Sequence, residues 1–232
     1  MKRYLSGFGL MIFLVVLSSC APKEITKGEA FPKMYAEHPV AILVLPPMNE
    51  TTAADAKEYY STTIAEPLSF AGYYVFPIEV VSDMLKAEGL YDTETMLGMP
   101  VQKFRDYTGA DAVLFIKIKK WDTHYYVLAG NVTVSVDFLL KSTITGAELW
   151  KYSGTMRVDT TGDSGGAGGL AGLLIKVIAT AAKTAAQDYV PVALRANVLA
   201  LHSIPFGKYN PSFSQDKQMQ AVFVNLINGT NK

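Results

Sequence analysis

The chain has 232 residues, with 21 lysine and arginine residues against 21 aspartate and glutamate residues. A formal net charge of zero leaves no global positive charge to draw the protein to nucleic acid. The single cysteine excludes a disulfide framework and a cysteine-rich zinc module. A hydrophobic content of 50% is too high for a disordered chain, and the length suits one domain of ordinary size, or one domain with tails.

The amino terminus has the features of an export signal. Lys2 and Arg3 give it a basic start, and an almost unbroken apolar run follows over residues 8–17. This run is about ten residues long, whereas a membrane-spanning helix needs roughly 20. We therefore expect residues 1–19 to be a signal peptide that is removed, and not a permanent transmembrane segment.

A lipid-attachment sequence follows the apolar run. Leu17, Ser18, Ser19 and Cys20 resemble the bacterial lipobox, in which small side chains enter a peptidase cleft and the cysteine thiol accepts diacylglycerol. The alternative is a signal peptide that merely contains a cysteine. We expect Cys20 to begin the mature protein and to carry acyl chains such as palmitate, which together anchor it durably. Ala21, where an aspartate would favour retention, indicates the outer membrane by analogy with enteric sorting.

The mature chain divides into three expected parts. Residues 20–38 have mixed composition with Gly28, Pro32 and no clean period, which leaves them open as a lipidated tether or as a strap packed on the fold. Residues 39–202 are expected to form the α/β domain. Residues 203–232 are expected to form a carboxyl-terminal tail with a short helix.

The elements expected before residue 110 combine buried strands with amphipathic helices. In chain order they are a strand over 40–45 stopped by Pro46 and Pro47, a helix over 53–71, a strand over 73–77, and helices over 80–90 and 100–107. Pro67 is expected to kink the first helix or end it early, because proline lacks a backbone N–H.

Three later segments alternate between apolar and polar residues with a period of two, around 114–118, 132–140 and 150–158. Such alternation, with a tight turn at Thr145 and Gly146, predicts an antiparallel meander with one packed and one solvated face. Further helices are expected over 170–186, 192–201 and 218–228. The predicted class is α+β (α/β), a mixed sheet that contains the three-strand meander, with helices packed mainly on one face.

A glycine-rich stretch precedes the helix expected over 170–186. Gly168 and Gly172 form a G-x-x-x-G pair, which lets two backbones approach closely. A helix lying tightly on its own sheet explains this pair, and a contact between subunits or a membrane-inserting element is the alternative. Gly168 and Gly172 are therefore a candidate oligomer contact.

No complete catalytic or metal-binding constellation is found. Ser164 lies in a G-x-S-x-G match by letter, but further glycines intervene before the helix that a nucleophile elbow requires. The three histidines, His38, His124 and His202, lack metal-ligand spacing. We expect no enzyme activity, no metal and no cofactor.

Several segments together resemble a family of bacterial outer-membrane lipoproteins known mainly as meningococcal antigen candidates. Besides the lipobox, they are residues 44–52, 67–77 and 109–114 and, more loosely, 205–211. The resemblance implies a fold similar to the periplasmic domain of curli-type secretion lipoproteins and to the amino-terminal domain of the Tol-system propeller protein. It also implies work beside a curli-channel-like lipoprotein in transport or envelope assembly, and it supplies no catalytic residues.

The function expected from these observations is that of an accessory or assembly component of an envelope or secretion-transport complex. The protein would be anchored in the outer membrane, face the periplasm, contact envelope proteins through its sheet face or glycine-rich helix, and form a homo-oligomer. The alternative is a peptidoglycan- or lipid-binding regulator of an envelope enzyme.

Overall fold

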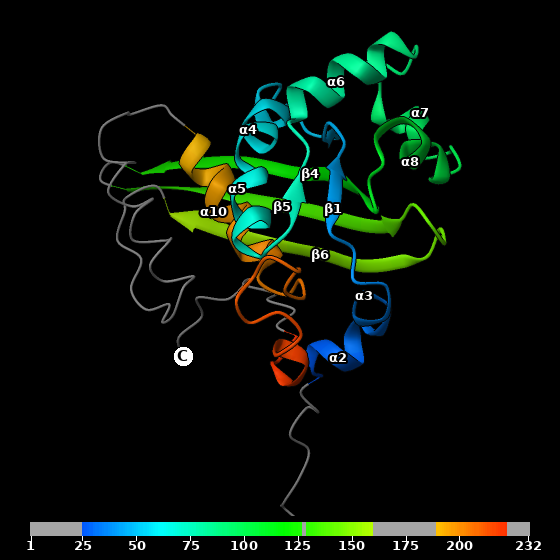
Figure 1. Cartoon of the computed structure of the whole chain (residues 1–232). Coiled ribbons are helices and arrows are strands. Elements are labelled where there is room, and N and C mark those ends of the chain that lie inside the picture. The colour runs from blue at the N-terminus through cyan, green and yellow to red at the C-terminus, as the bar shows by residue number, and fades with distance from the viewer. Residues whose placement is uncertain (1–24, 127–128, 160–188, 222–232) are drawn as a thin grey trace, which may run out of the picture.

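The computed structural model describes residues 25–126, 129–159 and 189–221. They form a mixed six-stranded sheet with helices on both sides (Figure 1), so the predicted α+β class is confirmed. The main order of strands is β3-β1-β4-β5-β6, and β2 pairs with β4 beside β1. The lipobox, the glycine-rich stretch and the helices expected over 170–186 and 218–228 lie outside the described residues, apart from the first residues of the last segment.

The parallel half of the sheet is built from short strands. They are β1 (Ala41–Val44), β2 (Met48–Asn49) and β3 (Tyr74–Val75). Strand β1 pairs in parallel with β3 on one side and with β4 on the other. The two prolines that follow β1 interrupt the strand, because proline cannot donate to the ladder, and pairing with β4 resumes at β2. The sequence pattern did not predict this two-residue strand.

The predicted antiparallel meander is confirmed. Its strands are β4 (Ala112–Tyr126), β5 (Ala129–Ser142) and β6 (Glu148–Asp159). Gly146 in the turn before β6 has a φ of +76°, a left-handed value that glycine adopts without strain. The register of β4 against β5 shifts between Ile118 and Lys120, which marks a β-bulge.

The helices of the domain are short. They are α4 (Ala56–Thr63), α5 (Ala65–Phe70), α6 (Ile78–Ala87), α7 (Thr93–Met96), α8 (Gln102–Thr108) and α10 (Val190–Leu201). The helix expected over 53–71 breaks at Ile64, because Pro67 has no N–H to bond to the carbonyl of Thr63. The sequence pattern also missed α7, which is a single turn closed by the Asp92 side chain.

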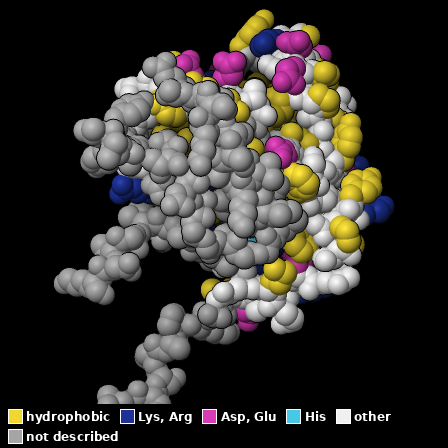
Figure 2. Space-filling model, turned by 90° about the vertical axis from the view of Figure 1, so that its left-hand side faces the viewer, with side chains coloured by type: hydrophobic (Ala, Val, Ile, Leu, Met, Phe, Trp, Pro, Cys, Tyr) yellow, Lys and Arg dark blue, Asp and Glu magenta, His cyan; other side chains and the backbone are white. Residues whose placement is uncertain are grey.

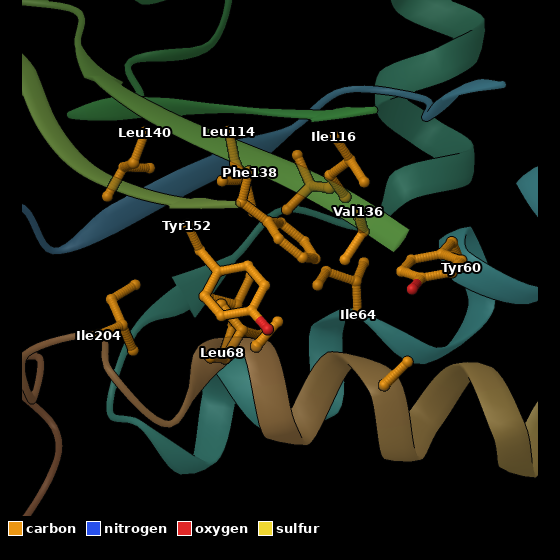
Figure 3. Close-up of a cluster of buried hydrophobic side chains, with 14 of the residues drawn as sticks. Tyr60, Ile64, Leu68, Leu114, Ile116, Val136, Phe138, Leu140, Tyr152 and Ile204 are labelled. Atoms are coloured by element: carbon orange, nitrogen blue, oxygen red, sulfur yellow. The ribbon is translucent and has the colours of Figure 1, made fainter. Parts of the chain in front are cut away.

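The larger part of the core lies between one face of the sheet and helices α4, α5 and α10. Figure 3 shows Leu114 and Phe138 pointing from the strands toward Ile64 and Leu68. A second cluster on the other face joins β1 and the start of β4 to α6, α7 and α8. The expectation of helices mainly on one face therefore describes the meander, whereas the parallel half is covered on both faces.

The segments before and after this domain also pack against it. Residues 25–38 contain α2 (Lys27–Ala30) and α3 (Pro32–Glu37), and the buried Phe31 and Met34 belong to the main core. Residues 25–38 are therefore a packed strap and not an extended tether. Residues 203–221 contain the short 3-10 helix η2 (Asp216–Gln218) and bury Ile204 in the same core, so this part of the expected tail belongs to the fold.

Candidate functional site

The residues that the sequence singles out for chemistry lie outside the described part of the chain. This holds for Cys20 with the rest of the lipobox, for Gly168 and Gly172, and for Ser164. Two features that could serve the function are built from described residues. One joins the amino-terminal segment to the carboxyl-terminal one, and the other is an exposed aromatic surface beside β3.

Backbone hydrogen bonds fasten the strap to the segment after η2. The N–H of Lys27 donates to the carbonyl of Met219, and the N–H of Ala221 donates to the carbonyl of Ile25, both at 2.8 Å. Between them Thr26 forms an antiparallel bridge with Gln220. Thr26 also starts α2 with a reciprocal capping box, which satisfies N–H groups that a helix start leaves free. The strap is thus fixed at Ile25, the first described residue.

A buried ion pair lies under this junction, and we call it the clasp. The Nζ of Lys27 is 3.3 Å from Oδ2 of Asp216, and the two side chains are 2% and 0% exposed. The same ammonium donates to the carbonyl of Ile204 at 2.9 Å and lies 4.8 Å from the ring centroid of Phe206. Burial lowers the pKa of Lys27, and the Asp216 carboxylate opposes that shift.

The Asp216 carboxylate of the clasp also interacts with Tyr35. Burial and the neighbouring Asp216 carboxylate raise the pKa of Tyr35, so this phenol stays neutral at physiological pH. Tyr35 Oη and Asp216 Oδ1 are buried and have no hydrogen-bond partner among the described atoms. Asp216 Oδ2 additionally accepts the N–H of Phe206 at 2.9 Å. The clasp therefore connects the strap to two places in the carboxyl-terminal segment.

Two consecutive tyrosines at the parallel edge of the sheet differ in exposure, because one side chain is buried and the other is exposed. Tyr73 is buried, and its hydroxyl donates to the carbonyl of Pro205 at 2.5 Å. Tyr74 is 50% exposed and packs edge-on against Phe76, with ring centroids 5.1 Å apart. Adjacent residues of a strand point to opposite sides, so the Tyr73-Tyr74 pair carries a signal for this arrangement, although the sequence alone leaves open which ring is outside.

Two more aromatic rings are exposed near Tyr74. Phe70 is 48% exposed and Tyr209 is 65% exposed. Gly72, with a φ of +95°, brings them into one region, because its carbonyl accepts the N–H of Tyr209 at 3.0 Å and Asn210 Nδ2 donates to the Phe70 carbonyl at 3.0 Å. We call Phe70, Tyr74 and Tyr209 the edge patch. On the described surface visible in Figure 2, exposed hydrophobic groups lie as separate spots along one side.

The second face of the meander is polar, and three of its lysines form ion pairs. Nζ to carboxylate-oxygen distances are 2.8–3.0 Å in the pairs Lys117–Glu50, Lys119–Asp137 and Lys120–Asp122. Hydroxyl groups on β5 and β6 join the same network. Compensated, half-exposed charges of this kind are typical of a solvated strand face.

Neither of two surface hollows holds a catalytic arrangement. One, of about 420 Å³, lies between the strap and the start of β6, and the other, of about 580 Å³, lies between α4 and α6. Their linings contain no histidine and no cysteine. Within the described ranges, no group of three histidine, cysteine or acidic residues could hold a metal ion. The helices that the structure describes are also too short or too polar to cross a membrane.

Comparison with known proteins identifies the family. A family model described as "Putative lipoprotein GNA1162-like" matches residues 30–205. The chain belongs to this GNA1162-like lipoprotein family. It is 31% identical over 178 residues to the "Putative lipoprotein NMB1124/NMB1162" of Neisseria meningitidis serogroup B, covering 77% of this chain and 80% of the relative. The resemblance to meningococcal lipoproteins inferred from the sequence is therefore confirmed.

Two solved structures are similar to this GNA1162-like chain. The crystal structure of lipoprotein GNA1162 from Neisseria meningitidis is 33% identical, with a TM-score of 0.49, and the match covers 63% of this chain and 100% of that one. A PelC dodecamer from Paraburkholderia phytofirmans is 19% identical, with a TM-score of 0.38, and the match covers 75% of this chain and 95% of that one.

Proposed function

We propose that this GNA1162-like protein is a lipid-anchored accessory component of an envelope or secretion-transport complex. Acyl chains on Cys20 hold it in the outer membrane with its domain facing the periplasm. Membership of a lipoprotein family over residues 30–205 carries this proposal. The order of a basic start, an apolar run and the lipobox before Cys20 supports it independently.

The protein acts through contacts with other proteins, not through catalysis. The edge patch is the surface best suited to this task, because exposed aromatic rings supply large, rigid contact area and are enriched where binding energy concentrates. Its partner is an envelope protein such as a curli-channel-like lipoprotein, and the protein also associates with copies of itself. The paired charges on the meander face contribute little net attraction.

A pull-down from detergent-solubilised envelopes after cross-linking in cells tests both parts of the proposal. The wild-type protein should fractionate with the outer membrane and capture a reproducible set of envelope proteins. Cys20→Ala should leave the membrane fraction and lose that set. The double variant Tyr74→Ala/Tyr209→Ala should stay in the membrane and lose it.

Ile144→Ala is the matched control, because Ile144 is an exposed apolar residue in the turn between β5 and β6, away from the edge patch. This variant should capture the same proteins as the wild type. Identical localisation and identical partners for all four proteins would contradict the proposal. Sedimentation of the domain with purified sacculi, without captured proteins, would favour a peptidoglycan-binding regulator instead.

A further inference from the structure

The spacing between the lipid and the first fixed residue limits how far the domain can stand from a membrane. Ile25 follows Cys20 by five positions, and an extended chain spans at most about 3.6 Å per residue. Ile25 can therefore lie no more than about 18 Å from the lipidated residue. The backbone is held at Ile25, since its carbonyl accepts the N–H of Ala221.

The strap cannot detach from the domain to lengthen this connection without a large loss of stability. Detaching it would pull the buried Phe31 and Met34 out of the main core. It would also separate Lys27 from Asp216, leaving a carboxylate in an apolar site without its counter-ion, which is strongly unfavourable. The clasp therefore fixes both the reach of the anchor and the end of the domain to which the anchor is attached.

This end of the domain presents side chains suited to a lipid surface. Ile25 and Met219 are large apolar residues that are nearly half exposed, and they lie on the two segments joined by the Thr26–Gln220 bridge. Lys217 is exposed beside them, with Nζ 5.3 Å from the ring centroid of Tyr35. Apolar side chains flanked by a lysine match the headgroup region, where the stem can stay in apolar surroundings and the charge in water.

We propose that Ile25, Lys217 and Met219, the anchor face, lie against the lipid surface. This inference rests on the lipidation of Cys20 in the proposed function. Figure 1 places α2 at one end of the domain and α6 and α7 at the opposite end, so these two helices point away from the membrane. Helix α5 lies between the two ends, and the edge patch at its carboxyl terminus is reachable by a neighbour on the same membrane.

Fluorescence quenching in vesicles tests this orientation. The lipidated protein is reconstituted into phosphatidylethanolamine–phosphatidylglycerol vesicles that contain a headgroup-attached quencher. Because Cys20 is the only cysteine of the sequence and is consumed by lipid, Met219→Cys and Tyr91→Cys can each be labelled alone. Tyr91 is highly exposed and lies between α6 and α7. A domain of this size is tens of ångströms across, so quenching at position 219 should exceed that at position 91 by at least about threefold.

A Gly/Ser insertion of about 20 residues before Ile25 provides the second arm. It adds a root-mean-square reach of about 25 Å and should lower quenching at position 219 at least about twofold. Equal quenching at positions 219 and 91, or no effect of the insertion, would overturn the proposed orientation. Flotation of the same vesicles separates the two proposals, because wild-type protein that does not float refutes lipidation at Cys20, whereas protein that floats with equal quenching refutes only the orientation.

Discussion

Removing one partner of the clasp is expected to destabilise the domain strongly. Lys27→Met keeps the length of the side chain but deletes the ammonium that lies 3.3 Å from Asp216 Oδ2 and 2.9 Å from the Ile204 carbonyl. Among the described residues, Asp216, whose side chain is fully buried, then keeps the N–H of Phe206 as a hydrogen-bond donor to Oδ2 but no cation to compensate its charge. An uncompensated buried charge of this kind costs about 3–5 kcal/mol, a large part of the usual 5–15 kcal/mol of folding free energy.

Urea unfolding of the mature chain with Cys20→Ser, followed by tryptophan fluorescence, measures this cost. With a denaturant slope of about 2–3 kcal/mol/M, Lys27→Met should lower the midpoint by about 1–2 M. Adding Asp216→Asn removes the orphaned charge and should recover most of the loss. The surface control Lys86→Met breaks the exposed pair with Asp83 and should change the unfolding free energy by less than about 0.5 kcal/mol.

The clasp also predicts a pH dependence. Burial lowers the pKa of Lys27 below its usual 10.5, so between the folded and unfolded pKa values the unfolded chain binds more protons. Stability should therefore rise with pH in that alkaline window, and Lys27→Met should abolish the rise. A loss under about 1 kcal/mol for Lys27→Met, or a Lys27→Met/Asp216→Asn double variant that loses the sum of the two single losses, would refute the reasoning about the clasp.

Three further predictions concern stability. Asp111 accepts two backbone N–H groups at the start of β1. Burial acts to raise the pKa of Asp111, but these hydrogen bonds and Arg105 outweigh it and hold the pKa below 3.8. Asp111→Ala should therefore cost about 2 kcal/mol at pH 7, and the wild-type and variant stabilities should converge as the pH falls below 3.8. Gly72→Ala should cost more than about 3 kcal/mol, because Gly72 has a positive φ and an added Cβ would meet the backbone of the 207–210 loop. Gly89 also has a positive φ but open space around it, so Gly89→Ala should cost only about 1–2 kcal/mol. Similar losses for both variants in thermal unfolding would count against the packing argument. Lys119→Ala should change the unfolding free energy by less than about 1 kcal/mol, since its pair with Asp137 is half exposed, and a larger loss in urea would show that the meander face is a structural network.

The sequence predicts the meander well because its strands are long and each buries one face. The alternation along residues 132–140 is decisive by itself, and it places Val134 and Phe138 in the core as observed. Short elements cannot be predicted from the periodicity of apolar residues. Strand β2 has two residues and α7 has four, too few to display a period, and both depend on tertiary pairing with β4 or on a single capping carboxylate.

The clasp and the edge patch could not be predicted for a different reason. Lys27 and Asp216 are separated by 189 positions, and a lysine in a polar segment is normally solvated. Its burial follows only once the strap meets the segment after α10. Tyr73, just before β3, and Tyr74 in β3 carry part of the signal for the edge patch. Tyr209 joins the patch through a hydrogen bond to the carbonyl of Gly72, a long-range contact that no local sequence pattern predicts.

Site-specific photo-cross-linking in intact cells tests the central claim most directly. A photoreactive phenylalanine analogue is placed at Tyr74 or Tyr209 of the edge patch, and at Thr133 on the meander face as the control. We predict discrete cross-linked envelope proteins from positions 74 and 209, none from position 133, and loss of these products when Cys20 is changed to alanine. Adducts of equal yield from all three positions, or products that persist unchanged without Cys20, would contradict a lipid-anchored accessory protein that works through the edge patch.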